Sequence, residues 1–288
     1  MPAPTDRPTP LLEKLYRATT NPIRLLPDFL IIGAQRGGTT SLYNYLVEHP
    51  AVGTASIKEV HFFDTRHYKQ GRAWYRAHFP SAVQKYCVEH VQKHDFITGE
   101  ASPYYLFHPH SPTRTAKMLP HVKLIVMLRN PVDRAYSQFH HERAGGHEKL
   151  TSFEEAIGCE EKRLAGELEK VLGDEDYSSY SHRHFSYLAR GIYIDQLPTW
   201  MNLFPREQVL ILKSEEFYAD AEAVFKQTLD FLNLPHGQLK QRKQGYRRYN
   251  DTNPPKMDPA TRKQLIEYFE PHNARLYEYL GEQFGWDR

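Results

Sequence analysis

The stretch DFLIIGAQRGGTTSLYNYL, residues 28–46, decides the fold class. Residues 28–34 form a mainly apolar run, which is typical of a strand buried on both faces of a parallel sheet. Gly37 and Gly38 follow as a turn, and residues 39–49 carry apolar side chains at helical spacing. The stretch therefore predicts a strand, a glycine turn and a helix.

Further apolar runs predict three more strands, at residues 95–99, 122–128 and 208–212, separated by segments with helical spacing. Strands that alternate with helices favour a parallel sheet with helices on both of its faces. We expect an α/β protein, a three-layer sandwich whose central parallel sheet is flanked by helices.

The rest of the chain predicts a single domain preceded by an arm. Residues 1–26 are polar and rich in proline, which indicates an N-terminal tail or arm, whereas residues 27–288 hold neither an internal repeat nor a long linker. Within this domain, residues 150–190 alternate acidic and basic side chains before a segment rich in Tyr and His. We expect a helical insertion there, a candidate lid over a substrate site. Helices are also predicted at 221–232, 259–269 and 271–280.

The composition excludes several classes of protein. The 288 residues hold 37 Lys and Arg against 35 Asp and Glu, a net charge of +2, which is too small for the basic footprint of a nucleic-acid-binding protein. Two cysteines support neither a disulfide framework nor a cysteine-rich metal site, and they suit a reducing compartment. No apolar run approaches the roughly 20 residues of a membrane-spanning helix, and no leader is visible. We therefore expect a cytoplasmic protein without a membrane span or a nucleic-acid partner.

The glycine turn is similar to a phosphate-binding loop with one residue changed. In the pattern G-x-x-x-x-G-K-[ST], backbone N–H groups cradle phosphates and the lysine reaches the terminal ones. Gly33, Gly38 and Thr40 occupy matching positions, but Thr39 replaces the lysine, and the nearest cation in the loop is Arg36. The loop therefore suits a phosphate group although it lacks the usual lysine.

A second strand-to-helix turn lies at residues 124–133, LIVMLRNPVD. Pro131 fits the first helical position and Asn130 the cap, so Arg129 stands at the end of a strand and directly before a helix. A nucleotide hydrolase needs an acidic residue at such a strand end to hold Mg²⁺. The arginine instead predicts that protein cations and helix N-termini hold an anionic nucleotide directly, without a bridging metal.

Several stretches resemble one family of enzymes. PDFLIIGAQRGGTTSLYNYL resembles the 5'-phosphosulfate-binding loop of sulfotransferases that use 3'-phosphoadenosine 5'-phosphosulfate (PAPS), and LIVMLRNPVDRAYSQF resembles their 3'-phosphate-binding turn. KEVHFFD and GEASPYYL resemble signatures of the heparan sulfate-type branch and its soluble bacterial relatives, and RGIYIDQLPTWMNLFPREQVLILKSEEF resembles a later one. The resemblance implies a P-loop NTPase-like fold. It also implies transfer of a sulfuryl group from PAPS to a hydroxyl or amine of an acceptor, which leaves adenosine 3',5'-bisphosphate (PAP).

The resemblance further implies which residues bind PAPS. Backbone N–H groups and hydroxyls of the glycine turn suit the 5' end, and the second turn, which contains Arg129, suits the 3'-phosphate. A basic stretch beyond residue 240 is similar to the loop that closes over PAPS in relatives. The full set is Arg36, Gly37, Gly38, Thr39, Thr40, Ser41, Arg129, Ser137, Tyr193, Lys243, Gly245, Tyr246 and Arg247.

Three residues are assigned to the chemistry by the same resemblance. Glu59 in KEVHFFD matches the glutamate that takes the acceptor proton, and His61 matches a histidine beside it. An extended segment would point both side chains the same way. Arg36 matches a position where many relatives have lysine, and it would stabilise charge on the bridging oxygen. Because arginine keeps its proton at neutral pH, that role is electrostatic.

Other interpretations of these residues stay open. Glu59 is also a candidate partner of Lys58, with Glu100 as the reserve base, and Arg129 is a candidate partner of Asp133. The alternative functions are a metal-dependent P-loop nucleotide kinase or NTPase and a non-catalytic nucleotide-binding relative.

The acceptor stays open between a saccharide, a lipid and a small metabolite, as does the oligomeric state. Ala101 stands where glycosaminoglycan-modifying relatives usually carry lysine, which argues against a polyanionic acceptor. Adjacent histidines such as His140 and His141 do not face one site on a helix, and no Cys cluster accompanies the pair His182 and His184, so no metal is expected.

Overall fold

The computed structural model describes residues 15–17, 19–91, 93, 95–236, 246, 249 and 255–286. The strands are β1 (Phe29–Gly33), β2 (Val52–Thr54), β3 (Ile97–Ala101), β4 (Lys123–Leu128) and β5 (Val209–Lys213). The α-helices are α2 (Thr39–Val47), α3 (Gly71–Arg76), α4 (Ala82–Val91), α5 (Ser111–Met118), α6 (Pro131–Ala144), α7 (Phe153–Gly158), α8 (Glu160–Leu164), α9 (Glu167–Gly173), α10 (Tyr180–His184), α11 (Leu197–Met201), α12 (Ser214–Ala219), α13 (Ala221–Leu232) and α14 (Pro259–Leu280). Short 3₁₀ turns are η2 (Asn21–Ile23), η3 (Arg66–Gln70), η4 (Ala189–Gly191), η5 (Tyr193–Asp195) and η6 (Arg206–Gln208).

The five strands form one sheet in the order β2-β3-β1-β4-β5, and every neighbouring pair is parallel. The four strands expected from the sequence correspond to β1, β3, β4 and β5, which confirms the predicted α/β class. The three-residue strand β2 was not predicted. Because all strands run the same way, their carboxyl ends meet at one edge, which is where ligands bind in open α/β sheets.

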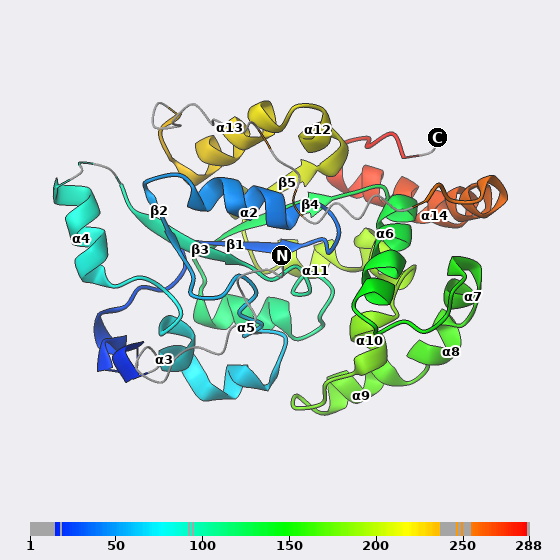
Figure 1. Ribbon diagram of the computed structural model, residues 1–288, viewed down its shortest axis with the longest axis horizontal. Helices are drawn as coiled ribbons and strands as arrows, with labels where there is room; N and C mark the ends of the chain where they lie inside the picture. Colours follow the sequence, from blue (N-terminus) through cyan, green and yellow to red (C-terminus); the bar gives the residue numbers. More distant parts are fainter. Residues whose placement is uncertain are drawn as a thin grey trace.

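Helices cover both faces of the sheet, and β1 in its centre shows how (Figure 1). Phe29 and Ile31 belong to a core cluster with side chains of α2, α12 and α13. Leu30 and Ile32 belong to a second cluster, on the other face, with side chains of α3, α11 and α14. All four side chains are fully buried, and each such burial stabilises the fold by about 1.5–3 kcal/mol.

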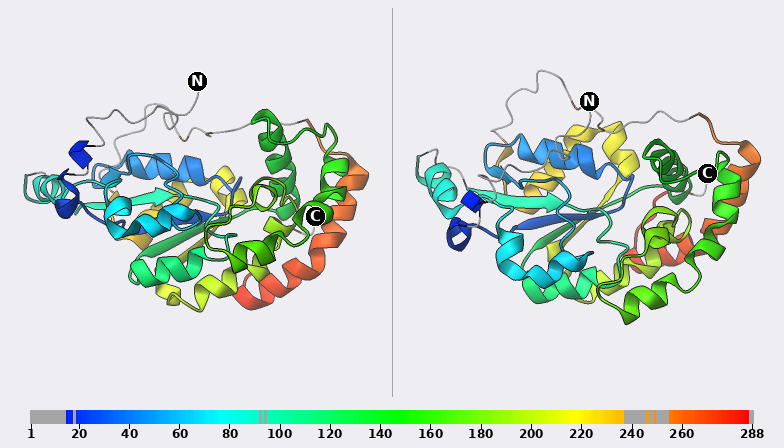
Figure 2. Two further views of the ribbon diagram at one scale, coloured as in Figure 1. Left: turned by 90° about the horizontal axis from the view of Figure 1, so that it is seen from below. Right: turned by 60° about the horizontal axis from the view of Figure 1, so that its bottom comes forward.

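The helices α6 to α10 and α14 gather at one end of the molecule (Figure 2). The sequence predicts a break of α14 at Pro271, but the helix is continuous and holds this proline inside. Leu265 and Phe269, before the proline, pack with α6 and α7. Leu276 and Tyr277, after it, belong to the core cluster that contains Leu30 and Ile32. Burial on both sides outweighs the lost helical hydrogen bond, which costs about 3 kcal/mol.

The described part of the N-terminal arm lies against the loop that follows α3. Arg24 Nη1 donates to Phe79 O at 2.7 Å, and Leu25 N donates to Pro80 O at 2.8 Å. Among the described residues, no helix combines the length and the apolar character that crossing a membrane requires.

Candidate functional site

The turn between β1 and α2 is fixed by its own backbone. A Cβ on Gly37 would lie 2.6 Å from Met127 O, and Gly38 has a φ of 96°, which strains any other residue. Ser214 Oγ, at the start of α12 directly after β5, donates to Gly37 O at 2.6 Å. Both glycines are therefore required for the tight turn itself, which holds the first N–H groups of α2 at the edge of the sheet.

A segment from the distant part of the chain lies against the start of α2. Tyr249 N donates to Ser41 Oγ at 3.0 Å, and the ring of Tyr246 lies 5.2 Å from the ring of Tyr45 between centroids. Of the basic stretch assigned to the closing loop, Lys243, Gly245 and Arg247 lie outside the described residues. The two described tyrosines of this stretch, Tyr246 and Tyr249, contact residues of α2, the helix that follows the predicted phosphate loop.

Arg36 lies against the predicted 3'-phosphate residues. Its Nε donates to Ser137 Oγ on α6 at 2.9 Å, and Arg129 Nη1 donates to Arg36 O at 3.1 Å. Tyr193 Oη in turn donates to Arg129 O at 2.8 Å. The structure thus brings together four residues that the sequence places far apart.

The alternative partner of Arg129 is engaged elsewhere. Asp133, in the first turn of α6, accepts from Arg262 Nη1 at 2.7 Å. The guanidinium of Arg129 lies 5.9 Å from the centroid of the Tyr218 ring instead. Within the described residues, the structure records no ion pair between Arg129 and Asp133.

Glu59 follows β2 at the same edge of the sheet and lies between two cationic groups. Lys58 Nζ is 2.8 Å from Glu59 Oε1, and His61 Nε2 is 3.3 Å from Glu59 Oε2. Burial on its own would raise the pKa of Glu59, but the hydrogen bond from His61 and the charge of Lys58 outweigh it and lower the pKa to about 2. The side chain keeps 36% of its surface exposed. Glu59 is therefore an ionised carboxylate that a substrate can reach.

His61 is held by a buried carboxylate behind it. Its Nδ1 donates to Asp64 Oδ2 at 2.6 Å, and the Asp64 side chain is fully buried. Burial would lower the pKa of His61, but the charge of Asp64 and this hydrogen bond raise it to about 10. The two carboxylates therefore favour the protonated form of His61, whereas the charge of Arg183, whose Nη2 lies 3.1 Å from His61 Nε2, opposes it.

The segment from Glu59 to His61 is not extended, since His61 has a φ of 50°. The condition under which strand alternation would bring Glu59 and His61 together is therefore not met, although the two side chains do meet. The side chains of Glu59 and His61 are held together by their ion pair and not by the alternating directions of side chains along a strand.

Glu100, the reserve base, is fully buried at the end of β3. Its Oε1 accepts from Tyr75 Oη at 2.6 Å and from Tyr105 Oη at 2.9 Å, and its Oε2 accepts from Ser102 Oγ at 2.7 Å and from Val60 N at 3.1 Å. Burial raises its pKa against these four hydrogen bonds. All its acceptor capacity is used to hold the loop that carries the other glutamate, so Glu100 has a structural role.

A cavity of about 260 Å³ lies beside Glu59 and His61. Helix α10, from the predicted insertion, lines it with Arg183 and His184, and Arg190 also lines it. Arg183 Nη2 is 3.1 Å from His61 Nε2. The insertion therefore contributes a cation directly to this cavity, which the alternating charge pattern of the sequence did not indicate.

One group of side chains in the described part of the chain has the donor set of a metal site. Glu142, His147 and His184 each offer one ligand atom, and these atoms lie within 4.8 Å of one another. In the structure, Glu142 Oε2 accepts from His184 Nδ1 at 2.8 Å, and the two histidine rings stack with centroids 4.0 Å apart. Two arginines, Arg183 and Arg190, line the same cavity, and their charges oppose binding of a cation. The absence of a metal requirement stays a prediction.

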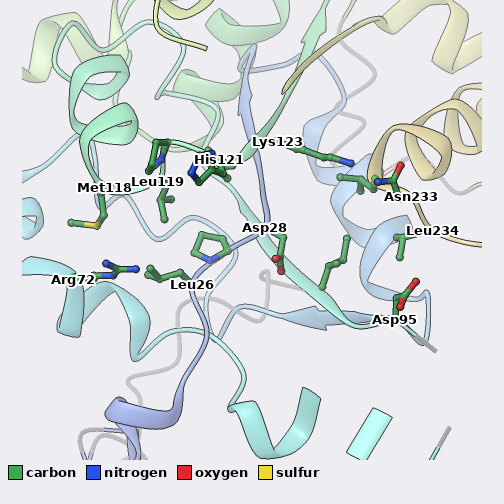
Figure 3. Close-up of a pocket in the computed structure, with 15 residues that line it drawn as sticks. Leu26, Asp28, Arg72, Asp95, Met118, Leu119, His121, Lys123, Asn233 and Leu234 are labelled. Carbon is green, nitrogen blue, oxygen red and sulfur yellow. The ribbon is translucent and has the colours of Figure 1, made fainter. Parts of the chain in front are cut away.

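A larger cavity, of about 530 Å³, lies at the opposite edge of the sheet (Figure 3). Asp28 precedes β1 there and Lys123 begins β4, so the cavity is at the amino ends of the strands. Lys123 Nζ donates to Phe231 O at 2.6 Å. None of the predicted site residues that the structure describes lines this cavity.

Lys58 is the residue that sequence reasoning missed. Its Nζ donates to Thr40 Oγ1 in the first turn of α2 at 2.8 Å, besides contacting Glu59. The sequence singles out Lys58 only as a partner of its neighbour, because β2 and a loop separate it from α2.

A model of the sulfotransferase domain matches residues 26–273. The chain belongs to the sulfotransferase domain family. Its most similar relatives include the membrane-associated sulfotransferase kil1 of Dictyostelium discoideum, 28% identical over 328 residues that cover 91% of this chain and 66% of that protein. The heparan sulfate glucosamine 3-O-sulfotransferase 6 of Homo sapiens is 28% identical over 291 residues, which cover 91% of this chain and 74% of the relative.

Among solved structures, a sulfotransferase from Alicyclobacillus acidocaldarius aligns with a TM-score of 0.69 and 28% identity, covering 92% of this chain and 100% of that chain. The P-loop NTPase-like fold and the likeness to the heparan sulfate-type branch and its bacterial relatives are thereby confirmed. The sulfotransferase chain spans just under two thirds of the length of the Dictyostelium relative.

Proposed function

We propose that this protein transfers a sulfuryl group from PAPS to a hydroxyl or amine of an acceptor and releases PAP. One observation carries the proposal: Lys58 Nζ lies 2.8 Å from Thr40 Oγ1 and 2.8 Å from Glu59 Oε1. A carboxylate base thus adjoins the helix N-terminus that suits an anionic phosphosulfate. Direct in-line transfer requires the base and the bound phosphosulfate to lie close together, and Glu59 and the N-terminus of α2 meet this requirement at the carboxyl edge of the sheet.

Glu59 takes the acceptor proton in this proposal, and its pKa explains how. At about 2, the pKa makes the carboxylate a weak base before the nucleotide binds. A phosphosulfate at the loop competes with Glu59 for the ammonium of Lys58. Weakening that ion pair raises the pKa of Glu59 toward the range of a working base. Nucleotide binding therefore activates the base.

The nucleotide contacts that we propose follow the geometry at the two turns. Residues 37–41 bind the 5' end, and Arg129, Ser137 and Tyr193 bind the 3'-phosphate. The contact between Tyr249 N and Ser41 Oγ supports a closing role for residues 243–247.

The acceptor in this proposal is a saccharide, a lipid or a small metabolite, and residues 150–190 form the lid of its site. Arg183 and His184 on the cavity wall support that role for the insertion. We also propose a cytoplasmic location, supported by the two free cysteines, Cys87 and Cys159. A metal-dependent kinase or NTPase is not favoured, because the chain belongs to the sulfotransferase family and β4 is followed by Arg129 rather than by an acidic residue.

The test combines nucleotide binding with an acceptor screen. PAP should raise the melting temperature, with about 2.7 kcal/mol of added stability at one hundred times its dissociation constant. Glu59→Gln should bind PAP at least as tightly as the unaltered protein, because the carboxylate no longer competes for Lys58. It should lose transfer from labelled PAPS by about 100-fold or more, since it removes the base.

Glu89→Gln is the matched control, because Glu89 pairs with Lys85 on α4 at 3.4 Å and does not line the cavity beside Glu59. It should leave both measurements unchanged. No thermal shift at millimolar PAP would contradict the proposed function. Unchanged transfer by Glu59→Gln would remove that residue from the role of base.

A further inference from the structure

A further cavity, of about 670 Å³, lies between the insertion and the part of the domain around α5. Its volume falls within the roughly 300–1,000 Å³ that is usual for small-molecule sites. The insertion contributes residues of α8, α9 and α10, and the other lining residues come from α5, from the segment before it and from the chain between η4 and α11. This cavity shares no lining residue with the cavity beside Glu59.

The lining of this larger cavity is mainly apolar. Leu164 and Leu168 come from the insertion, and the side chain of Leu168 is exposed although it is apolar. The other apolar lining residues are Leu106, Phe107, Pro109, Pro112, Ala165, Ala189 and Ile192. Binding of an apolar body is favourable in such a cavity, because it removes this surface from water.

Packed rings lie between the larger cavity and the cavity beside Glu59. Tyr104 lines the cavity beside Glu59, whereas Phe107 and His182 line the larger one. Tyr104 Oη and His182 Nδ1 are 2.7 Å apart, and the His182 ring stacks on the Phe107 ring with centroids 4.3 Å apart. The larger cavity is therefore a separate space from the proposed acceptor cavity.

Two buried polar side chains that line the larger cavity each have an unpartnered atom. Gln196 is 8% exposed, and its Nε2 donates to Arg190 O and Ile192 O, both at 3.0 Å. Gln196 Oε1 has no hydrogen-bond partner in the described part of the chain, and neither has Nδ1 of His108, which is 6% exposed. Buried polar atoms in proteins are nearly always hydrogen-bonded. An N–H group of a ligand would supply the partner that Gln196 Oε1 lacks.

The charged side chains that line the larger cavity are all acidic: Glu161, Glu169 and Asp195. Asp195 pairs with Arg275 Nη2 at 3.5 Å, whereas Glu161 and Glu169 form no ion pair with any described residue. Burial lowers the pKa of His108 to about 4 and that of His182 to about 3, so both lining imidazoles are neutral at physiological pH. The cavity therefore favours a cationic ligand over an anionic one.

We propose that the larger cavity is a binding site for a small amphiphilic amine, separate from the donor and acceptor sites. The apolar body of the amine packs against Phe107 and the two leucines of the insertion. The carboxylates of Glu161 and Glu169 and the unpartnered Gln196 Oε1 are the acceptors for its N–H groups. This site does not depend on the proposed function, because it uses neither the phosphate loop nor Glu59.

The experiment compares three probes of the same chain length, octylamine, octanol and octanoate, by isothermal titration calorimetry with the full chain. Octylamine should bind about 10-fold more tightly than octanol, and octanoate more weakly than octanol, because only the head group differs. Added salt should reduce the preference for octylamine, since it screens the exposed carboxylates.

Variants at exposed lining residues locate the probe. Leu168→Ser should weaken binding of all three probes by about 5-fold or more, because it removes apolar surface from the cavity. Leu172→Ser is the matched control, since Leu172 is an exposed leucine of the same helix, α9, that does not line the cavity. It should change no affinity.

A double variant tests the charge. Glu161→Gln combined with Glu169→Gln should weaken octylamine by about 5-fold and leave octanol unchanged, because it removes two carboxylates and keeps the shape of the cavity.

Octanoate that binds as tightly as octylamine would overturn the proposal, and so would the absence of octylamine binding at millimolar concentration. Equal octylamine affinity of Leu168→Ser and the unaltered protein would show that the probe binds elsewhere. Loss of octylamine affinity in Glu59→Gln would place the amine in the cavity beside Glu59 and would also overturn the separate site.

Discussion

A row of charged groups lies at the carboxyl edge of the sheet. It alternates the cationic groups of Lys58 and His61 with the carboxylates of Glu59 and Asp64. His61 and Lys58 lower the pKa of Glu59, and His61 lowers that of Asp64, while the two carboxylates raise the pKa of His61, each time against the effect of burial. The row is therefore fixed in charge across the physiological range, and only the arrival of an anion or loss of a proton from His61 changes it.

The raised pKa of His61 predicts a loss of stability at alkaline pH. Its contribution is complete below about 6.5, the ordinary pKa, and is lost as the pH rises toward about 10, the folded-state pKa. Between pH 6.5 and 9, the free energy of unfolding of the unaltered protein should fall by about 1–3 kcal/mol relative to His61→Gln. Urea unfolding at both pH values measures this difference.

His67 offers a control of opposite sign. Burial and the charge of Arg66 lower the pKa of His67, so its contribution changes only below pH 6.5. His67→Gln should keep the alkaline slope of the unaltered protein. If His61→Gln keeps that slope too, the ion pair with Asp64 does not control the titration.

Residue-scale contacts are where the sequence predicted least. It assigned Arg36 and Ser137 to opposite ends of one nucleotide, but the two lie 101 positions apart and bond to each other. Lys58 was not predicted to reach Thr40. Such contacts depend on rotamers and on how loops return to the sheet, and neither leaves a pattern in the sequence.

At the scale of elements, the turn from β1 to α2 depends on the close approach of β4. The Cβ of an alanine at position 37 would lie 2.6 Å from Met127 O and 3.0 Å from Ala34 O, and both are backbone atoms that cannot rotate away. Gly37→Ala should therefore cost about 1–3 kcal/mol of unfolding free energy and weaken PAP binding. Chemical unfolding and PAP titration of the variant check this.

Gly158→Ala is the matched control for that substitution. Gly158 ends α7, and a Cβ there meets nothing within 4 Å. This variant should be neutral or slightly more stable. Equal destabilisation by both alanines would show that the approach of β4 does not constrain the turn.

Elements with strong local signals were predicted well. The bounds of α13 match, Asn130 caps α6 by accepting from Val132 N at 3.0 Å, and Asp258 caps α14. The strand β2 was not predicted because its three residues are too few to show an alternating hydrophobic pattern. The continuity of α14 was missed because tertiary packing on both sides of Pro271 overrides the local rule.

At the scale of the whole molecule, the candidate site collects cations from separate parts of the chain while the net charge stays at +2. Arg129 follows β4, Lys58 follows β2 and Arg183 comes from the insertion. At the end of β4, Arg129 thus stands where a nucleotide hydrolase carries the acidic residue that holds Mg²⁺.

This arrangement predicts that metal removal has no effect. After treatment with EDTA, PAP binding and sulfuryl transfer should equal those of the untreated protein. His184→Ala, which removes one donor of the group with Glu142 and His147, should leave the response to EDTA unchanged. Loss of transfer that added Zn²⁺ or Mn²⁺ restores would contradict the prediction.

The placement of α10 has a consequence for how such an enzyme diversifies. Part of the wall that faces the proposed acceptor comes from a helix of five residues within the insertion, which supplies Arg183 and His184, whereas the turns proposed for the nucleotide belong to β1, α2, β4 and α6. Side-chain substitutions at Arg183 and His184 can therefore alter which acceptor is accepted while they leave the backbone carbonyls of α10, which Arg190 joins to Gln35 in the loop, in place. Exchange of this one segment between relatives is the natural starting point for engineering a new selectivity onto an unchanged donor site.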